Sequence, residues 1–253
     1  MAQTPIALQL YTVRDELEKD FTGTLRKVAE MGYKKVELAG FGGNTAKDVK
    51  SILDEFGLKA IGSHVGLDQL EGQGSSKAIE DHNLLGIPYV VIPWLPQERR
   101  EDKAGYQRLA GVLNEVGRKV KDAGMTLCYH NHNFEFDQKF DGKPGLAILF
   151  DETDPKLVQG ELDTYWVLYA GADPVQFLGK YPGRFPLIHI KDMDKDDRSF
   201  APIGTGTLPL DAIAQAAPAA GARYLIVEQD QTKGPSLDAV RTSINNLRAK
   251  GYA

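Results

Sequence analysis

The chain has 253 residues, 42% of them hydrophobic and 26% charged, and carries a net charge of -5. This composition is ordinary for a folded domain and excludes a disordered, collagen-like or coiled-coil chain. The negative net charge argues against a nucleic-acid or anionic-membrane partner, because such partners bind cationic faces. The length fits a single domain over residues 1–253 with a large buried core.

The cysteine count and the apolar runs narrow the chemistry and the compartment. Cys128 is the single cysteine of the sequence, which excludes an internal disulfide and a cysteine-based zinc cluster. No apolar run approaches the roughly 18 residues that cross a bilayer, and the first residues lack the pattern of a signal peptide. We therefore expect a soluble protein without a membrane partner. It is expected to be cytoplasmic as given, and periplasmic if a natural leader has been removed.

Eight apolar, strand-like runs recur along the chain, with helical patterns between them. In chain order they cover residues 6–11, 35–39, 59–64, 89–94, 125–132, 157–163, 185–191 and 223–228. Several helical stretches end at a glycine, such as Gly32 and Gly124, where a left-handed helix cap is expected. Strands that alternate with helices are typical of βα units around a parallel sheet. Since eight such units make one closed barrel, the sequence predicts an α/β fold of the (β/α)8 type.

The segments between these runs divide into helices and long loops. The clearest helix is predicted from Tyr106 to Ala123, where apolar residues recur at spacings of three and four. Residues 66–77 and 134–146 contain clustered glycine and turn residues, and each segment directly follows a predicted strand. In a barrel, such loops lie on the face that carries active sites.

Polar and aromatic residues gather at the ends of the predicted strands, where a parallel barrel places its catalytic side chains. They are Gln9, Tyr11, Glu37, His64, Trp94, His130, His132, Asp163, His189, Lys191, Glu228 and Asp230. Side chains alternate in direction along a strand, so His130 and His132 are predicted to share one face.

Four of these residues, at the ends of the fifth to eighth predicted strands, have side chains that bind divalent cations. They are His130, Asp163, His189 and Glu228. Singly, each has a structural explanation, since Asp163 can cap the next helix and Glu228 can pair with Lys191 or Arg223. Together they favour one metal site, because buried charge is costly unless it is paired or metal-bound.

Eight motifs also carry a resemblance to a known family across nearly the whole chain. They are Leu8-Gln9-Leu10-Tyr11, Lys35-Val36-Glu37-Leu38, Gly62-Ser63-His64, residues 129–136 (YHNHNFEF), residues 161–167 (ELDTYWV), His189-Ile190-Lys191-Asp192, Gly204-Thr205-Gly206 and Val227-Glu228-Gln229-Asp230. On these motifs the chain resembles the sugar phosphate isomerase/epimerase family, whose fold is the xylose isomerase-like TIM barrel. The last five motifs, in this order, are typical of one branch of that family.

The resemblance implies one divalent metal ion, such as manganese, cobalt, zinc or magnesium. Family members hold it with a Glu, Asp, His and Glu set on strands five to eight. Asp163, His189 and Glu228 match the last three positions, and His130 stands where many epimerases have the first glutamate. Ketose epimerases use two metal-bound glutamates on opposite faces of the substrate. The histidine therefore disfavours two-base epimerisation and leaves one-base proton abstraction, followed by isomerisation or β-elimination.

The predicted function is that of a metal-dependent carbohydrate isomerase or epimerase. The metal would polarise a carbonyl of the sugar and stabilise the enediolate that forms when a base removes the α proton. Glu228, His64 and His132 are the candidate bases. Lys191 is expected to neutralise oxyanion charge or orient Asp163, with an ordinary ion pair as the alternative.

The expected partner is a small carbohydrate, whose C–H faces pack on aromatic rings while its hydroxyls bind polar groups. The candidate substrate-binding residues are Tyr11, Glu37, Trp94 and Trp166. For the aromatic residues, packing between strand and helix is an equal explanation. Glu37 is expected to bind a sugar hydroxyl or act as a remote acid, with a salt bridge to Lys34 or Lys35 as an equal alternative. Gly204-Thr205-Gly206 offers backbone N–H groups to a phosphate, but Arg198 is the single arginine nearby. Unphosphorylated sugars and glycosides are thus at least as well supported. Family members often pair through helices, which makes a homo-oligomer a further expectation.

Three other functions are weighed against this prediction. A lyase or hydrolase of 3-keto-glycosides would use the same metal site, because a ketone acidifies the neighbouring C–H. A non-catalytic, sugar-binding barrel is the alternative from another class, and a complete ligand set argues against it. An apurinic endonuclease shares the barrel, but it needs more ligands and a basic face, whereas the isoelectric point here is near 5.6.

Overall fold

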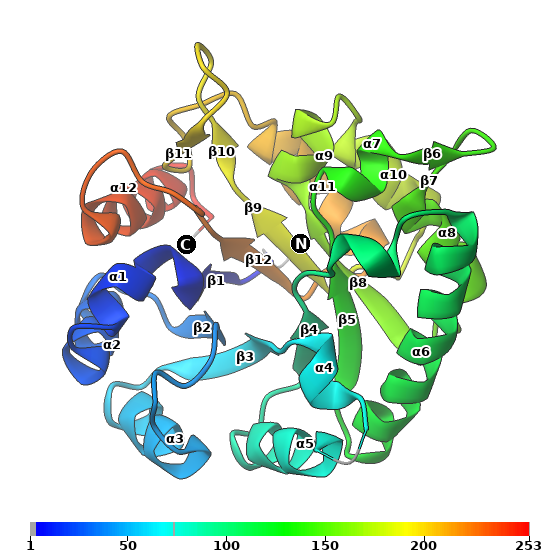
Figure 1. The fold of residues 1–253 in the computed structure, drawn as a ribbon. Coiled ribbons are helices and arrows are strands. Elements are labelled where there is room, and N and C mark those ends of the chain that lie inside the picture. Colours follow the sequence, from blue (N-terminus) through cyan, green and yellow to red (C-terminus); the bar gives the residue numbers. More distant parts are fainter. Residues whose placement is uncertain (1–3, 73, 253) are drawn as a thin grey trace.

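The computed structural model describes residues 4–72 and 74–252, which form a closed barrel of parallel strands surrounded by helices (Figure 1). The barrel order is β1-β12-β9-β8-β5-β4-β3-β2, so each strand pairs with the barrel strands that precede and follow it in the chain. The strands are β1 (Ile6–Gln9), β2 (Lys35–Leu38), β3 (Lys59–His64), β4 (Tyr89–Ile92), β5 (Thr126–His130), β8 (Val158–Asp163), β9 (Leu187–Ile190) and β12 (Tyr224–Val227). The predicted (β/α)8 barrel is confirmed.

Helices cover the outside of the barrel, and short elements decorate its loops (Figure 1). The helices are α1 (Arg14–Leu17), α2 (Phe21–Glu30), α3 (Ala46–Glu55), α4 (Leu67–Leu70), α5 (Ser75–Leu84), α6 (Lys103–Asp122), α7 (Phe134–Asp137), α8 (Gly145–Glu152), α9 (Thr164–Tyr169), α10 (Pro174–Lys180), α11 (Leu210–Ala220) and α12 (Ser236–Ala249), with 3-10 turns η1 (Leu10–Val13) and η2 (Gln97–Arg99). Two hairpins, β6 (Lys139–Phe140) with β7 (Lys143–Pro144) and β10 (Asp192–Met193) with β11 (Phe200–Ala201), stand apart from the barrel sheet. The two predicted long loops are thus partly folded, since they contain α4, part of α5, α7 and β6–β7.

Several strands end earlier than the apolar pattern predicts. β1 ends at Gln9 because the side chain of Gln9 accepts a hydrogen bond from the backbone N–H of Tyr11, which begins η1. β5 ends at His130, two residues before its predicted end. The backbone N–H of His132 donates a hydrogen bond to the carboxylate of Glu135 and not to a carbonyl of a neighbouring strand. Side chains close in sequence therefore accept the backbone hydrogen bonds at which these strands end, and the residues that follow lie on the rim of the barrel.

The longest helix, α6, shows why the helices lie so close to the barrel. It begins at Lys103, three residues before the predicted start, because the carboxylate of Asp102 accepts a hydrogen bond from the N–H of Gly105. On its buried face, a Cβ at Gly117 would come within 2.6 Å of the carbonyl oxygen of Leu157. Glycine at this position therefore permits contact between the helix and the backbone that leads into β8.

The interior of the barrel is apolar in one layer and polar in the next. The apolar layer consists of Ala7, Ile61, Val91, Cys128, Leu187 and Ile226, all fully buried. Side chains two residues apart on a strand point to the same face, so His130, His189 and Glu228 follow Cys128, Leu187 and Ile226 into the interior. The strands thus place a buried set of ionisable side chains at their carboxyl ends.

Over the residues that the structure describes, no helix has the length and apolar character that crossing a membrane requires.

Candidate active site

The four predicted cation ligands come together at the carboxyl end of the barrel. One ligand atom from each lies within 4.8 Å of the others, and each residue is at most 4% exposed. The pairing of strands explains this proximity, because Asp163 on β8 lies beside His189 on β9. The members of this group, called here the outer group, are His130, Asp163, His189 and Glu228.

Asp163 uses its two carboxylate oxygens for different purposes. Oδ1 accepts hydrogen bonds from the backbone N–H groups of Tyr165 (3.0 Å) and Trp166 (3.2 Å), so it caps α9. Oδ2 is buried and lies 2.7 Å from Nζ of Lys191. The capping role and the position among the candidate ligands therefore coexist in one residue.

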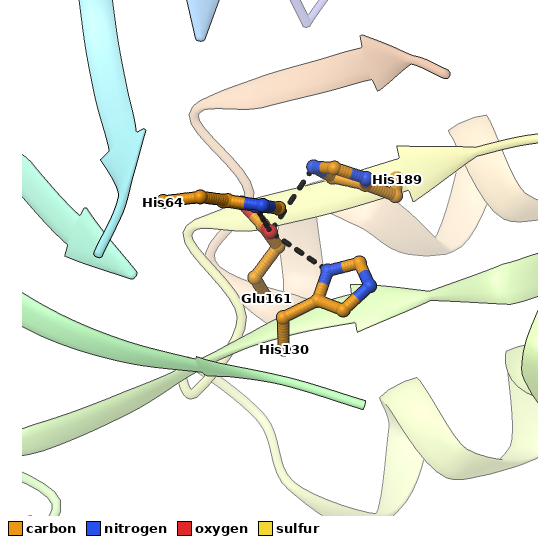
Figure 2. Close-up of side chains that lie close together, drawn as sticks. All are labelled: His64, His130, Glu161 and His189. Carbon is orange, nitrogen blue, oxygen red and sulfur yellow. Dashed lines mark hydrogen bonds and ion pairs between the residues drawn. The ribbon is translucent and has the colours of Figure 1, made fainter. Parts of the chain in front are cut away.

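Glu161, which the sequence reasoning missed, contacts three imidazoles (Figure 2). Its Oε1 is 2.9 Å from Nε2 of His64, 2.8 Å from Nδ1 of His130 and 3.1 Å from Nε2 of His189. Glu161 precedes Asp163 by two residues on β8, so strand alternation places both carboxylates on the inner face. The alternation of side chains along this strand is the sequence signal by which Glu161 can be identified.

Glu37 belongs to the same buried layer and does not reach the substrate side. Its Oε2 accepts a hydrogen bond from Nε2 of Gln9 at 2.8 Å, and it lies 2.7 Å from Nε2 of His189 and 3.4 Å from Nε2 of His64. Glu37 is fully buried and makes no ion pair with a lysine among the described residues. The inner face of β2 directs this carboxylate beneath the imidazoles and outside the wall of the pocket, so the contact of Glu37 with a sugar hydroxyl stays a prediction that this geometry does not favour.

The hydrogen bonds of His130 indicate where a cation fits. Burial, together with the positive neighbours His189 and Lys191, lowers the pKa of His130 well below its usual value, so the ring is neutral. Its one N–H is assigned to Nδ1, which faces Oε1 of Glu161. The lone pair of Nε2 then faces Oδ2 of Asp163 at 3.4 Å, without a hydrogen bond between them. A divalent cation fits between these two acceptors, although Nζ of Lys191 also contacts Oδ2 at 2.7 Å.

The carboxylates Glu161 and Glu37 orient the two histidines of the outer group. Glu161 faces Nδ1 of His130, and Glu37 faces Nε2 of His189, while Nδ1 of His189 lies 2.7 Å from Oε2 of Glu228. Carboxylates behind histidine ligands fix the ring orientation and the tautomer in metal sites. A second group of residues also lies close enough to hold an ion: His64, His130, Glu161 and His189. In that group, however, the carboxylate of Glu161 is already in contact with three imidazoles. We therefore favour the outer group as the cation site.

Lys191 places a positive charge inside the outer group. Its Nζ is 2.7 Å from Oδ2 of Asp163, 2.7 Å from Oε2 of Glu228 and 2.6 Å from Oδ1 of Asp230. Burial opposes this charge, but the three carboxylates raise the pKa of Lys191 well above its usual value. Burial also raises the pKa of Asp163 to about 6, even though Lys191 acts to lower it. Lys191 thus forms the ion pairs that the sequence reasoning gave as an alternative.

A pocket of about 620 Å3 opens directly above this site. Its wall includes His64, His130, His132, Lys191 and Glu228, and the rim carries Tyr11 and Trp94, which are 43% and 52% exposed. Trp166, by contrast, lies in the first turn of α9, with its ring 5.6 Å from that of His132 and outside the pocket wall. Tyr11 and Trp94 occupy the predicted substrate side, whereas Trp166 packs behind it.

The two other histidines of the pocket differ in charge. Burial acts to lower the pKa of His64, but Glu37 and Glu161 raise it to about 10, so this imidazole is protonated at neutral pH. Burial, together with the neighbouring His130 and the ammonium of Lys191, lowers the pKa of His132 to about 2. The Nδ1 atom of His132 is buried without a hydrogen-bond partner among the described residues.

The loop around Gly204-Thr205-Gly206 does not offer its N–H groups to a phosphate. The carboxylate of Asp192 accepts hydrogen bonds from the backbone N–H groups of Gly204 (2.8 Å), Gly206 (2.9 Å) and Leu208 (2.8 Å). An internal anion thus occupies the position that the sequence reasoning considered for a phosphate. This arrangement removes the single feature of the sequence that favoured a phosphorylated sugar.

The fold and the site define the class of the protein as a (β/α)8 barrel with a candidate metal centre at the carboxyl ends of its strands. The chain matches the xylose isomerase-like TIM barrel family over residues 25–250, and it belongs to that family. Two sugar phosphate isomerase/epimerases of known structure, both from Parabacteroides distasonis, are each 27% identical to it. The alignments cover 98% and 100% of this chain and 99% and 96% of those chains, with TM-scores of 0.84 and 0.86.

The curated relatives include inosose dehydratases. That of Geobacillus kaustophilus is 25% identical over 194 residues, which cover 68% of this chain and 62% of the relative. That of Clostridium beijerinckii is 35% identical over 91 residues, which cover 36% of this chain and 30% of the relative. The chain therefore spans less than two thirds of the length of these relatives. A 3-keto-D-glucoside 4-epimerase from E. coli, 19% identical with a TM-score of 0.74 over 98% of this chain and 100% of that one, shares the fold.

Proposed function

We propose that the protein is a divalent-metal-dependent isomerase or epimerase that removes a proton α to a carbonyl of a carbohydrate. The observation that carries the proposal is the buried outer group, in which one ligand atom from each of four residues lies within 4.8 Å of the others. The pocket that opens onto this group has aromatic rings on its rim, as expected for a sugar site. The isomerase/epimerase relatives support the same reaction class.

In our proposal the ion is manganese, cobalt, zinc or magnesium, and it would be held by the outer group, His130, Asp163, His189 and Glu228. When bound, the ion supplies a Lewis acid that polarises the carbonyl oxygen of the substrate.

The pocket residues divide between accepting and donating protons. Lys191 and His189 offset burial and hold the pKa of Glu228 well below its usual value, so its carboxylate is ionised and is the proposed base for the α proton. The protonated ring of His64 is the proposed donor toward a substrate oxygen. His132 stays neutral and lines the pocket, where its ring is proposed to contact the substrate. Lys191 offsets negative charge that develops on the enediolate.

A second candidate reaction is β-elimination on a keto-sugar or 3-keto-glycoside. It starts with the same proton abstraction by Glu228, after which the C–H electron pair forms a C=C bond. The oxygen substituent on the β carbon then departs and takes a proton from His64. The relatives named inosose dehydratase favour this outcome, and so does His130, which leaves Glu228 as the one glutamate of the ligand set.

The deciding experiment measures metal content and C–H exchange on one preparation. The purified protein is analysed by elemental mass spectrometry and incubated in deuterated water with free ketoses, aldoses and 3-keto-glycosides, followed by NMR. We expect about one equivalent of metal and deuterium at one carbon, with both lost in the double variant Asp163→Ala, His189→Ala. Exchange with release of the β substituent would establish elimination. Sugar binding with no exchange would overturn the enzymatic proposal in favour of a binding protein.

A further inference from the structure

The ammonium of Lys191 lies at the centre of three carboxylates, two of which belong to the outer group. Asp163 and Glu228 are the shared members, and Asp230 is the third, at 2.6 Å from Nζ. The side chain of Lys191 is 2% exposed, whereas that of Asp230 is 21% exposed and lines the pocket. A buried cation carried by the chain itself therefore contacts one oxygen of each carboxylate of the outer group.

These oxygens leave little room for both cations. Oδ1 of Asp163 caps α9, so Oδ2 is the atom left for an ion, and this is the atom that Lys191 contacts. Oε2 of Glu228 likewise contacts both Lys191 and His189. Two positive charges on one pair of oxygens repel each other strongly in a buried site, where screening is weak. One of them has to move.

Asp230 gives the ammonium a place to move to. It already contacts Nζ, stands nearer the solvent than the other two carboxylates and is not a member of the outer group. Lysine has a flexible four-carbon stem and a compact charged head, so a small displacement toward Asp230 retains one ion pair. We propose that Lys191 competes with the divalent ion for Asp163 and Glu228, and that Asp230 holds the displaced ammonium.

This inference rests on the proposed metal site, and its test reads metal affinity without any substrate. Zn2+ and Mn2+ are titrated against a chromogenic chelator with the wild type, Lys191→Met, Asp230→Asn and the double variant. Lys191→Met should bind metal about tenfold or more tightly, equal to about 1.4 kcal/mol. Asp230→Asn should weaken binding in the wild-type background and have no effect in the Lys191→Met background.

Two results would overturn the competition. One is equal metal affinity of Lys191→Met and the wild type. The other is equal weakening by Asp230→Asn in both backgrounds, which would mean that Asp230 acts through its charge alone. If Lys191→Met does not fold, as judged by circular dichroism, Lys191→Gln replaces it. Metal-dependent C–H exchange by a wild type whose affinity does not respond to Lys191 would refute this inference while leaving the proposed function intact.

Discussion

Replacing Glu161 by glutamine tests whether this carboxylate orients the two histidines of the proposed metal site. The substitution keeps the size of the side chain but replaces one oxygen by an NH2 group, which donates instead of accepting. Oε1 of Glu161 faces Nδ1 of His130 at 2.8 Å and Nε2 of His189 at 3.1 Å. An amide nitrogen that faces His130 would force the ring proton to Nε2, where the metal needs a lone pair.

The expected loss is limited because the two histidines depend on Glu161 to different degrees. His189 keeps a second carboxylate, since Nε2 lies 2.7 Å from Oε2 of Glu37. His130 has no second carboxylate at Nδ1 among the described residues. Removal of one such partner costs about 10-fold to 100-fold in metal affinity in other sites. We expect Glu161→Gln to fall in this range, and not at the product of two such losses.

The assay is chelator competition with Zn2+, supported by the visible spectrum of the Co2+ form, which reports ligand geometry. Glu152→Gln is the matched control, because Glu152 is an exposed residue at the end of α8. Urea unfolding of both variants checks that any loss of affinity is not a loss of fold. Unchanged affinity and spectrum in Glu161→Gln would refute the reasoning that this carboxylate sets the ring orientation.

Three further predictions concern stability and substrate binding. Gly117→Ala should lower the free energy of unfolding by about 1–3 kcal/mol, since the added Cβ meets the carbonyl of Leu157. Gly111→Ala, on the open side of α6, should raise the free energy of unfolding by up to about 1 kcal/mol. Equal effects of the two substitutions in urea unfolding would contradict this prediction. Burial raises the pKa of Glu135 from 4.5 to about 8, so the wild type loses stability as pH rises through this interval. One pH unit corresponds to 1.36 kcal/mol, so over roughly 3.5 pH units Glu135→Gln should remove up to about 5 kcal/mol of that pH dependence. If the stability of the wild type and of Glu135→Gln changed with pH in parallel, this prediction would be excluded. Trp94→Ala should raise KM about tenfold with little change in kcat, because the half-exposed ring lines the pocket; an altered kcat at constant KM would assign it another role.

The barrel could be predicted because apolar runs and helix-ending glycines are local features. The strand ends could not, because they depend on individual side-chain contacts such as that of Gln9 with the N–H of Tyr11. A list of strand ends also misses residues one layer deeper, which is why Glu161 was absent from the predicted site. Alternation along β8 would have revealed it, had the inner face been followed back from Asp163.

Contacts between distant parts of the chain set the remaining differences. Glu37 was assigned to the substrate because its strand end is polar, yet His189, 152 residues away, holds it in the buried layer. The glycine loop looked open because Asp192, 12 residues before Gly204, gives no local sign that its carboxylate binds the N–H groups. Sequence patterns indicate which polar groups lie near the rim of the barrel. Contacts between distant residues decide which of those groups remain available to bind a ligand.

The divided role of Asp163 ties the chemistry of the site to the local folding of the rim. One oxygen anchors the first turn of α9, which carries Trp166, and the other faces the candidate ligands. Loss of a helix cap typically costs about 1 kcal/mol, so a substitution that removes the whole carboxylate, and with it the proposed ligand, also destabilises this turn. Asparagine keeps an oxygen for the cap while discarding the charge. A substitution that removes this proposed ligand and keeps the helix cap is therefore restricted to side chains that retain an acceptor oxygen, a restriction that a ligand without a capping role would not have.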